Sequence, residues 1–432
     1  MQLIIFFPTF TYCCNLFPNS FYSGGYTMNS KMNTKQLVGI FAFCAGAMAA
    51  NMTMGLLGNI MQTYADVSPT VVQTLLVTPA LVGTIYGFLV GALNKAIPSK
   101  YLIIICEAAM LLYGLIFFLV GGKNITILIV AAGLAGINQG AMNTMVGLQL
   151  AAAISDDAKR GSMFGITSGF MNLVGVGIQN LGGIITASTG SWQNAYLLWI
   201  PIYALEIIIT FICLPNVAPE GKNAPQAGGP AAEAGGATRS MTPAFIIAIH
   251  YFFFFLFLYV FGTNVSAYIQ NAYKLGNAAA AALGASMVTI GGIFAGFLYG
   301  AYFKVLGKWT VPFLMGLCVI ALALPIFVTT SLAAIYVCGF VLGFAMMGCN
   351  PYILNYLHEV YPNAQYGQAM AIFAGFMNFG MVVAIYVINF LTQLFFHDAN
   401  SMSGKFTVAA VGQALVFLTS IFVYGMAKSH KE

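Results

Sequence analysis

Long apolar runs separated by short polar breaks account for almost the whole chain. A helix that crosses the hydrocarbon core of a bilayer needs about 20 mostly apolar residues, and twelve runs meet this requirement. Six lie before the middle of the chain: Leu37–Ile60, Val71–Leu93, Tyr101–Val120, Ile125–Leu150, Met163–Ala187 and Asn194–Leu214. Six lie after it: Pro243–Tyr268, Ala279–Phe303, Thr310–Thr329, Leu332–Asn355, Ala369–Leu394 and Phe406–Met426. The pattern predicts an all-α membrane protein with twelve spanning helices.

One long hydrophilic stretch divides these runs into two sets of six. It extends from Leu214 to Met241 and is rich in Pro, Gly and Ala with a few charges. Such a composition buries too little apolar surface to fold. We therefore expect a six-helix bundle over residues 33–214, a flexible cytoplasmic linker over 215–242 and a second bundle over 243–428. Residues 1–32 form a leader and residues 429–432 a short tail.

The leader has no basic segment, and its opening apolar run is too short for a signal peptide or a spanning helix. Gly24-Gly25 lies just upstream of Met28, and a Gly-Gly pair can be encoded by GGAGGN, a ribosome-binding sequence. We therefore expect translation to begin at Met28 or Met32, with residues 1–27 untranslated.

Composition places the chain in the membrane. Hydrophobic residues make up 60% and charged residues only 6%, with a mean hydropathy of +0.88, which is too little charge for a soluble surface. The net charge of +5 is spread along the chain, so it does not indicate a nucleic-acid partner. The eight cysteines form no CxxC or Cys/His ligand pattern, which indicates free thiols and no metal site.

The basic residues predict the orientation. With the amino terminus inside the cell, only Lys123, Lys274 and Lys405 of the 15 Lys and Arg residues fall outside. This asymmetry is what the positive-inside rule requires. Both termini are therefore expected in the cytoplasm.

The two halves contain matching segments. Phe88–Lys95 (FLVGALNK) returns 209 residues later as Phe297–Lys304 (FLYGAYFK), at the end of the second run of each half. Gly169–Asn172 (GFMN) returns 206 residues later as Gly375–Asn378, in the fifth run of each half. Because each repeat has an even number of helices, we expect parallel halves related by a pseudo-twofold axis along the membrane normal.

Two parallel sets of six helices joined by a linker are similar to the major facilitator superfamily of secondary transporters, and the likeness covers the chain after Met32. Arg160-Gly161 and Trp192–Pro201 (WQNAYLLWIP) resemble common patterns of that family. The loop after the second helix departs from the family pattern GxLaDrxGrkx, because Lys95 and its counterpart Lys304 stand where the acidic residue belongs. The resemblance implies gating loops that carry Lys95, Lys100, Arg160, Lys304 and Lys308.

The resemblance also implies that the first and fourth helices of each half line a central cavity, flanked by the second and fifth. As predicted here, these stretches carry amides and tyrosines and no Lys or Arg. The candidate substrate-binding residues are Asn51, Asn138, Gln139, Asn143, Asn172, Tyr259, Asn264, Asn350 and Asn378. Because polar groups rarely face lipid, each one either contacts substrate or forms an interhelical hydrogen bond. The uncharged lining favours a neutral or weakly charged organic solute over a phosphate ester or a dicarboxylate.

Three ionisable residues fall inside the predicted spans. Glu107, Glu206 and His250 are candidates for proton coupling, because ionisable groups are costly within a membrane and histidine titrates near neutral pH. The alternative is a structural role, in which the glutamates share a proton or bond to neighbouring helices.

These features indicate a secondary active transporter that works by alternating access, with the proton as candidate coupling ion. The alternatives are a drug or metabolite efflux antiporter and a non-transporting receptor on the same scaffold. An enzyme is disfavoured because the four histidines are scattered. The sequence contains no GxxxxGK[ST] motif, which would indicate direct use of ATP. We expect a monomer in the cytoplasmic membrane of a bacterium, with a small-molecule substrate and no cofactor.

Overall fold

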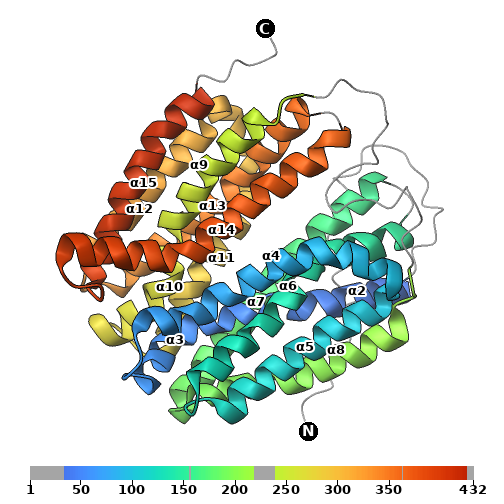
Figure 1. The fold of residues 1–432 in the computed structure, drawn as a ribbon, viewed down its shortest axis with the longest axis horizontal. Coiled ribbons are helices and arrows are strands. Elements are labelled where there is room, and N and C mark those ends of the chain that lie inside the picture. The colour runs from blue at the N-terminus through green and yellow to red at the C-terminus, as the bar shows by residue number, and fades with distance from the viewer. Residues whose placement is uncertain (1–33, 155–156, 218–238, 362, 426–432) are drawn as a thin grey trace. The chain divides into compact units, whose positions relative to one another are not determined.

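The computed structural model describes residues 34–154, 157–217, 239–361 and 363–425. The expected leader with its start site, the central part of the linker and the tail lie outside these ranges. Within them the chain forms helices joined by turns and contains no strand (Figure 1). The all-α fold class is confirmed.

The helices of the first half follow the predicted runs closely. They are α2 (Thr34–Gly46), η2 (Ala49–Asn51), α3 (Met52–Thr63), α4 (Pro69–Ala96), α5 (Ser99–Val120), α6 (Ile125–Ala153), α7 (Asp157–Thr189), η3 (Trp192–Leu198) and α8 (Trp199–Cys213). Individual residues favour the start of two of these helices. Pro69 is the first residue of α4. Asn124 Oδ1 accepts hydrogen bonds from the Thr126 and Ile127 N–H groups at the start of α6.

The second half repeats this order. Its elements are α9 (Thr242–Leu258), α10 (Val260–Ala267), the π-helical turn η5 (Tyr268–Ala272), α11 (Ala278–Leu306), η6 (Gly307–Trp309), α12 (Thr310–Phe327), α13 (Leu332–Val360), α14 (Asn363–Phe396) and α15 (Met402–Gly425). α15 begins four residues before the predicted Phe406. Lys405, which we expected in a loop, therefore lies in the first turn of a helix.

In the described part of the chain, eleven helical segments are long and apolar enough to cross a bilayer. One of them, Ala278–Phe327, has 50 residues, which as a single helix would measure about 75 Å. That is more than twice the hydrocarbon thickness, and η6 divides the segment into α11 and α12. It therefore supplies two crossings, and the predicted twelve are accounted for.

Close glycine contacts between helices occur at equivalent places in the two halves. α4 and α6 approach so closely that a Cβ on Gly136 would lie 2.6 Å from Pro79 O and 2.8 Å from Gly83 N. In the second half, a Cβ on Gly291 of α11 would meet Phe340 O, and one on Gly343 of α13 would meet Val288 O. Gly291 follows Gly83 by 208 residues, close to the 209-residue sequence offset. The same backbone contact thus occurs in both halves.

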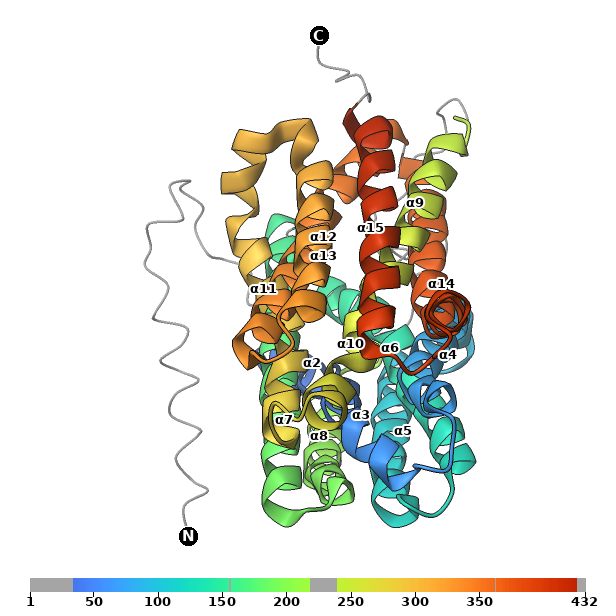
Figure 2. The same ribbon diagram turned by 90° about the vertical axis from the view of Figure 1, so that its left-hand side faces the viewer.

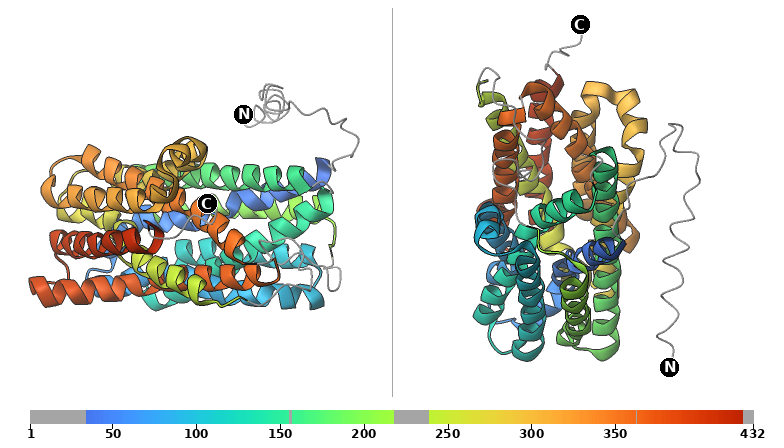
Figure 3. Two further views of the ribbon diagram at one scale, coloured as in Figure 1. Left: turned by 90° about the horizontal axis from the view of Figure 1, so that it is seen from above. Right: turned by 90° about the vertical axis from the view of Figure 1, so that its right-hand side faces the viewer.

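The first helix of each half is broken at an equivalent place. α2 and α3 are separated by a turn and η2 over residues 47–51, and α9 and α10 are separated at Tyr259, 208 residues after Asn51. At the first break Gly46 O accepts a hydrogen bond of 2.6 Å from the Tyr203 hydroxyl. A side chain that takes a backbone carbonyl in this way interrupts the helical ladder. Figure 2 shows α3 and α10, which follow these breaks, lying together, and Figure 3 shows the helices from two further sides.

Candidate functional site

The two halves contact each other through α3, α4 and α7 of the first half and α10, α11 and α14 of the second. Small residues permit a close approach: a Cβ on Gly55 would lie 2.8 Å from Ala282 Cα, and one on Gly58 would lie 2.8 Å from Ser266 O. We call this contact region the seam. It joins the repeated bundles backbone to backbone.

Polar groups of α3 and of the helix formed by α10 and η5 bond across the seam. Ser266 Oγ donates to Gly55 O at 2.6 Å and accepts from Gly58 N at 2.9 Å. Asn271 Nδ2 donates to Gly58 O at 3.1 Å, and Gln62 Nε2 donates to Asn271 Oδ1. Gln62 and Asn271 are 209 residues apart, so these equivalent positions of the repeat contact each other and lie next to the pseudo-twofold axis.

A second pair of equivalent residues also crosses the seam. Asn180 of α7 donates to Ser286 Oγ of α11 at 2.9 Å. Asn389 of α14, 209 residues later, donates to Thr70 Oγ1 at 2.8 Å and to Gln73 Oε1 at 3.1 Å, both on α4. In each half, an asparagine of the fifth helix therefore donates a hydrogen bond to the other half.

Gln73 extends this contact to a buried cation. Its Nε2 donates to Asn264 Oδ1 at 2.9 Å and to Thr263 O at 3.1 Å. Asn264 Oδ1 also accepts from Lys405 Nζ at 3.3 Å. Gln73 is 0%, Lys405 1% and Asn264 2% exposed. Such buried polar groups are costly to leave unpaired, so this cluster stabilises the closed seam.

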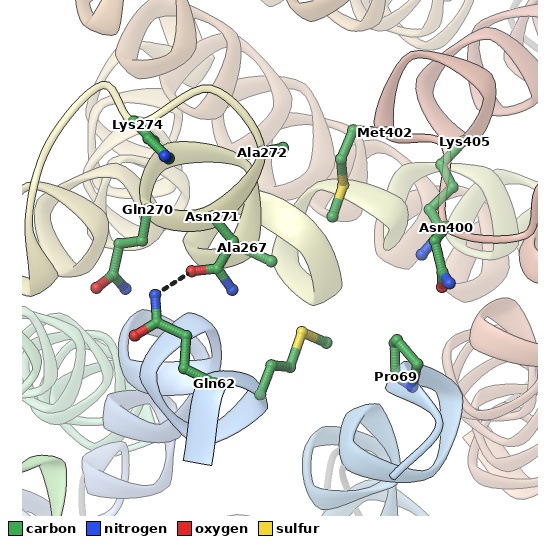
Figure 4. Close-up of a pocket in the computed structure, with 11 residues that line it drawn as sticks. Gln62, Pro69, Ala267, Gln270, Asn271, Ala272, Lys274, Asn400, Met402 and Lys405 are labelled. Carbon is green, nitrogen blue, oxygen red and sulfur yellow. Dashed lines mark hydrogen bonds between the residues drawn. The ribbon is translucent and has the colours of Figure 1, made fainter. Parts of the chain in front are cut away.

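A pocket of ≈ 480 Å³ lies over the seam. Figure 4 shows Gln62, Asn271 and Lys274 on one side of it and Lys405, Asn400 and Pro69 on the other. Both halves contribute to its lining.

The opposite end of the molecule is where the linker attaches. There Gln149 Nε2 donates to Ser99 Oγ and Pro215 O, and Val217 N donates to Ser99 Oγ. In the second half, Gln365 accepts from Arg239 N at the same end. We call this the linker end.

The halves are separated toward the linker end. A Cβ built on any of five glycines there would have no atom within 4 Å; these are Gly165 and Gly169 of α7, Gly296 and Gly300 of α11, and Gly375 of α14. These same helices make the seam contacts further along. The described contacts between the halves are therefore concentrated at the seam, and these five positions toward the linker end are not covered by the rest of the described protein.

Two predicted binding residues lie at the helix breaks, between the closed seam and the open end. Asn51 and Tyr259 are both half-buried. The Asn51 amide makes one long contact with the described residues, to Met48 Sδ at 3.9 Å, and no described residue bonds the Tyr259 hydroxyl. Unwound helices in transporters commonly expose polar groups to a cavity. Both residues are available to a solute.

Two further asparagines retain unpaired groups. Asn138 of α6 is 1% exposed, and neither of its amide atoms has a partner in the described part of the chain. Asn350 of α13 keeps its Oδ1 without one. Buried amides without partners are uncommon, so both remain candidates for substrate contact.

The other predicted binding residues are placed differently. Asn264 belongs to the seam cluster. Asn172 donates to Ser168 O of its own helix at 2.9 Å, Asn378 is half-buried and Gln139 is exposed. The side chain of Asn143 lies outside the described residues.

The two predicted glutamates share one site in the first half. Glu107 of α5 is 0% and Glu206 of α8 is 4% exposed, and the two carboxyl groups interact electrostatically. Glu107 Oε1 accepts from Thr210 Oγ1 at 2.6 Å, while both Glu206 oxygens lack a described hydrogen-bond partner. A Cβ on Gly46 would lie 2.7 Å from Glu206 Oε2. The acidic pair therefore adjoins the break between α2 and α3.

His250 is held within the second half. Its Nε2 lies 3.0 Å from Val416 O and its Nδ1 lies 3.3 Å from the Tyr424 hydroxyl, both on α15. A carbonyl can only accept, so Nε2 donates and Nδ1 accepts from tyrosine. Both ring nitrogens of His250 are engaged in joining α9 to α15.

The predicted gating residues lie near the linker end. Lys95, Lys304 and Lys308 are exposed. Lys100 Nζ lies 4.6 Å from the centre of the Phe211 ring, a cation–π distance. Arg160 opens α7.

The sequence did not indicate most polar residues of the seam, among them Gln73, Asn180, Asn389 and Lys405. A search for asparagines 209 residues apart would have found Asn180 and Asn389. Nothing local marks Gln73 or Lys405, because their partners are distant in sequence.

Comparison with known proteins agrees with this architecture. A sequence model of the Major Facilitator Superfamily matches residues 39–385. The crystal structure of nucleoside transporter NupG is similar with a TM-score of 0.67 and 12% identity, over 91% of this chain and 99% of that chain. A D-xylose-proton symporter is similar with a TM-score of 0.66 and 14% identity, over 93% and 98%. None of the curated proteins compared matches the sequence.

Proposed function

This chain belongs to the Major Facilitator Superfamily, and from that membership we propose that its two halves rock against each other to carry a small organic solute across the cytoplasmic membrane. It is a secondary transporter, and we assign it no enzymatic activity. The observation that carries the mechanism is the restriction of the described cross-half hydrogen bonds to the seam, with open space toward the linker end. Alternating access requires these contacts to break while equivalent surfaces close at the other end.

The solute site in this proposal lies at the two helix breaks. Asn51 and Tyr259 are equivalent positions in the two halves, and each has polar groups left free by the described residues. Asn138 and Asn350 supply further amide groups from α6 and α13. Amides and a phenol can donate to or accept from a polar organic molecule.

The distribution of Lys and Arg supports a cytoplasmic linker end. Lys95, Lys100, Lys304 and Lys308 lie near it, whereas Lys123, Lys274 and Lys405 lie near the seam. In this orientation both termini are cytoplasmic and the described conformation opens to the cell interior. The chain functions as a monomer in this proposal, because one copy contains both halves of the pathway.

The proposal is tested by two distances. Spin labels at positions 62 and 271 report on the seam, and labels at 169 and 296 report on the linker end. Gly169 precedes Asn180 by 11 residues and Gly296 follows Ser286 by 10, so both lie about three turns from the seam contact. Double electron–electron resonance is expected to show two states, in which one distance is short while the other is long. A single population for both pairs in lipid, with and without a pH gradient, would contradict alternating access.

Proton coupling through the acidic pair is a separate prediction. Glu107 and Glu206 share a buried site beside the α2–α3 break, and no Lys or Arg of the described residues forms an ion pair with them. A proton bound there can bias the bend of this helix, because buried charge is costly. In the wild type, the fraction of molecules with the seam closed should change between pH 5 and pH 8, roughly the range that physiological proton gradients cover. Glu107→Gln combined with Glu206→Gln should abolish this change.

His250→Gln is the comparison for that experiment. Since the His250 ring bonds only to α15 among the described residues, this variant should keep the pH dependence of the wild type. A flat response in His250→Gln together with a normal response in the double glutamine variant would transfer the coupling role to the histidine.

A further inference from the structure

The pocket over the seam is lined by cationic and amide side chains and by no acidic ones. Two lysines and four amide side chains are among its eleven lining residues, and no Asp or Glu is. Its volume of ≈ 480 Å³ falls within the usual range for small-molecule sites. The lining presents many N–H donors and no fixed negative charge, which is the environment that an anion requires.

Lys405 supplies a cation that forms no salt bridge with any described residue. An ammonium group has three donors, and the described contact of this one is a single hydrogen bond of 3.3 Å to a neutral amide oxygen, Asn264 Oδ1. Asp398 acts on it electrostatically, but Asp398 is exposed and forms no described ion pair with it. A buried charge without an anionic partner is costly, so an anion that entered the pocket would stabilise this ammonium group.

Lys274 stands on the other side of the same pocket (Figure 4). It follows the π-helical turn η5 with φ of 51°, in the left-handed region that lysine rarely adopts. Leu275 N then donates to Ile269 O at 2.7 Å, which closes the helix end. This exposed lysine lies at the solvent side of the pocket, whereas Lys405 lies at its buried side.

We infer that this pocket binds the carboxylate of a singly charged organic acid, with Lys274 attracting the anion and Lys405 receiving it. A dianion such as a phosphate monoester would need more than one desolvated cation, and only Lys405 of the two lysines is buried. The inference rests on the proposed transport function, because it takes the pocket over the seam as the place where the solute of the helix-break site first binds. It narrows the neutral or weakly charged solute expected from the sequence to a monocarboxylate.

The test compares acids with their amides at matched ionic strength. The purified full chain is melted in the presence of lactate or lactamide, benzoate or benzamide, and nicotinate or nicotinamide. A ligand that binds the folded state raises the melting temperature, so at least one acid should raise it while its amide does not. Lys274→Gln and Lys405→Met should each weaken binding of that acid about tenfold or more, because each removes a charge-assisted hydrogen bond.

Lys123→Gln is the matched control. Lys123 lies near the same end and donates to Leu119 O, but it does not line the pocket. This variant should bind the acid as the wild type does. The inference is overturned if no acid raises the melting temperature, if acid and amide bind equally, or if Lys274→Gln and Lys405→Met both bind normally. The spin-label distances need no ligand, so two alternating states without acid binding would overturn this inference alone.

Discussion

Gly58→Trp is expected to prevent closure of the seam and to trap the transporter open on that side. A Cβ at position 58 would lie 2.8 Å from Ser266 O and 2.9 Å from Gln270 Nε2, and an indole ring cannot fit between α3 and α10. Overpacking of this kind costs about 1–3 kcal/mol, and 1.4 kcal/mol is a factor of ten. The closed seam should therefore be disfavoured about 5- to 140-fold.

The measurement uses the two spin-label pairs. In Gly58→Trp the 62–271 distance should lengthen and the 169–296 distance should shorten, while the protein remains folded because the helices of each half are unchanged. Gly177→Trp is the control, since a Cβ on Gly177 of α7 would have no atom within 4 Å. An unchanged 62–271 distance in Gly58→Trp would show that this contact does not hold the halves together.

Gly140→Leu is expected to destabilise the first half. A Cβ on Gly140 of α6 would meet Gly83 O and would lie 2.9 Å from Gly87 N. These are backbone atoms of α4, which cannot turn aside as a flexible side chain can. The cost should be about 3 kcal/mol or more, a large share of the 5–15 kcal/mol that is typical of whole proteins. The melting temperature and the yield of monodisperse protein in detergent should both fall.

Gly147→Leu is the comparison in the same helix. Gly147 lies seven residues further along α6, about two turns, on nearly the same face. A Cβ there would have no atom within 4 Å, so this variant should melt within a few degrees of the wild type. If Gly140→Leu melts at the same temperature as Gly147→Leu, the close approach of α4 and α6 contributes little to stability.

The asparagines of the fifth helices illustrate how far sequence reasoning extends. Asn172 and Asn378 were predicted as equivalent binding residues because they stand in matching tetrapeptides. The asparagines of these two helices that bond across the seam are Asn180 and Asn389, while Asn172 bonds within its own helix. A residue's place along a helix follows from hydropathy, but the direction it faces depends on how neighbouring helices pack.

The sequence by itself determined the twelve crossings, the division into two halves and the repeat, because each depends on local hydropathy or on matching segments of the chain. Only the tertiary structure decided which end is closed and that Lys405 is buried beside Asn264. The partners in that cluster, Gln73, Asn264 and Lys405, come from three separate helices and from both halves. Their contact arises from the packing of one bundle against the other, which no local pattern records.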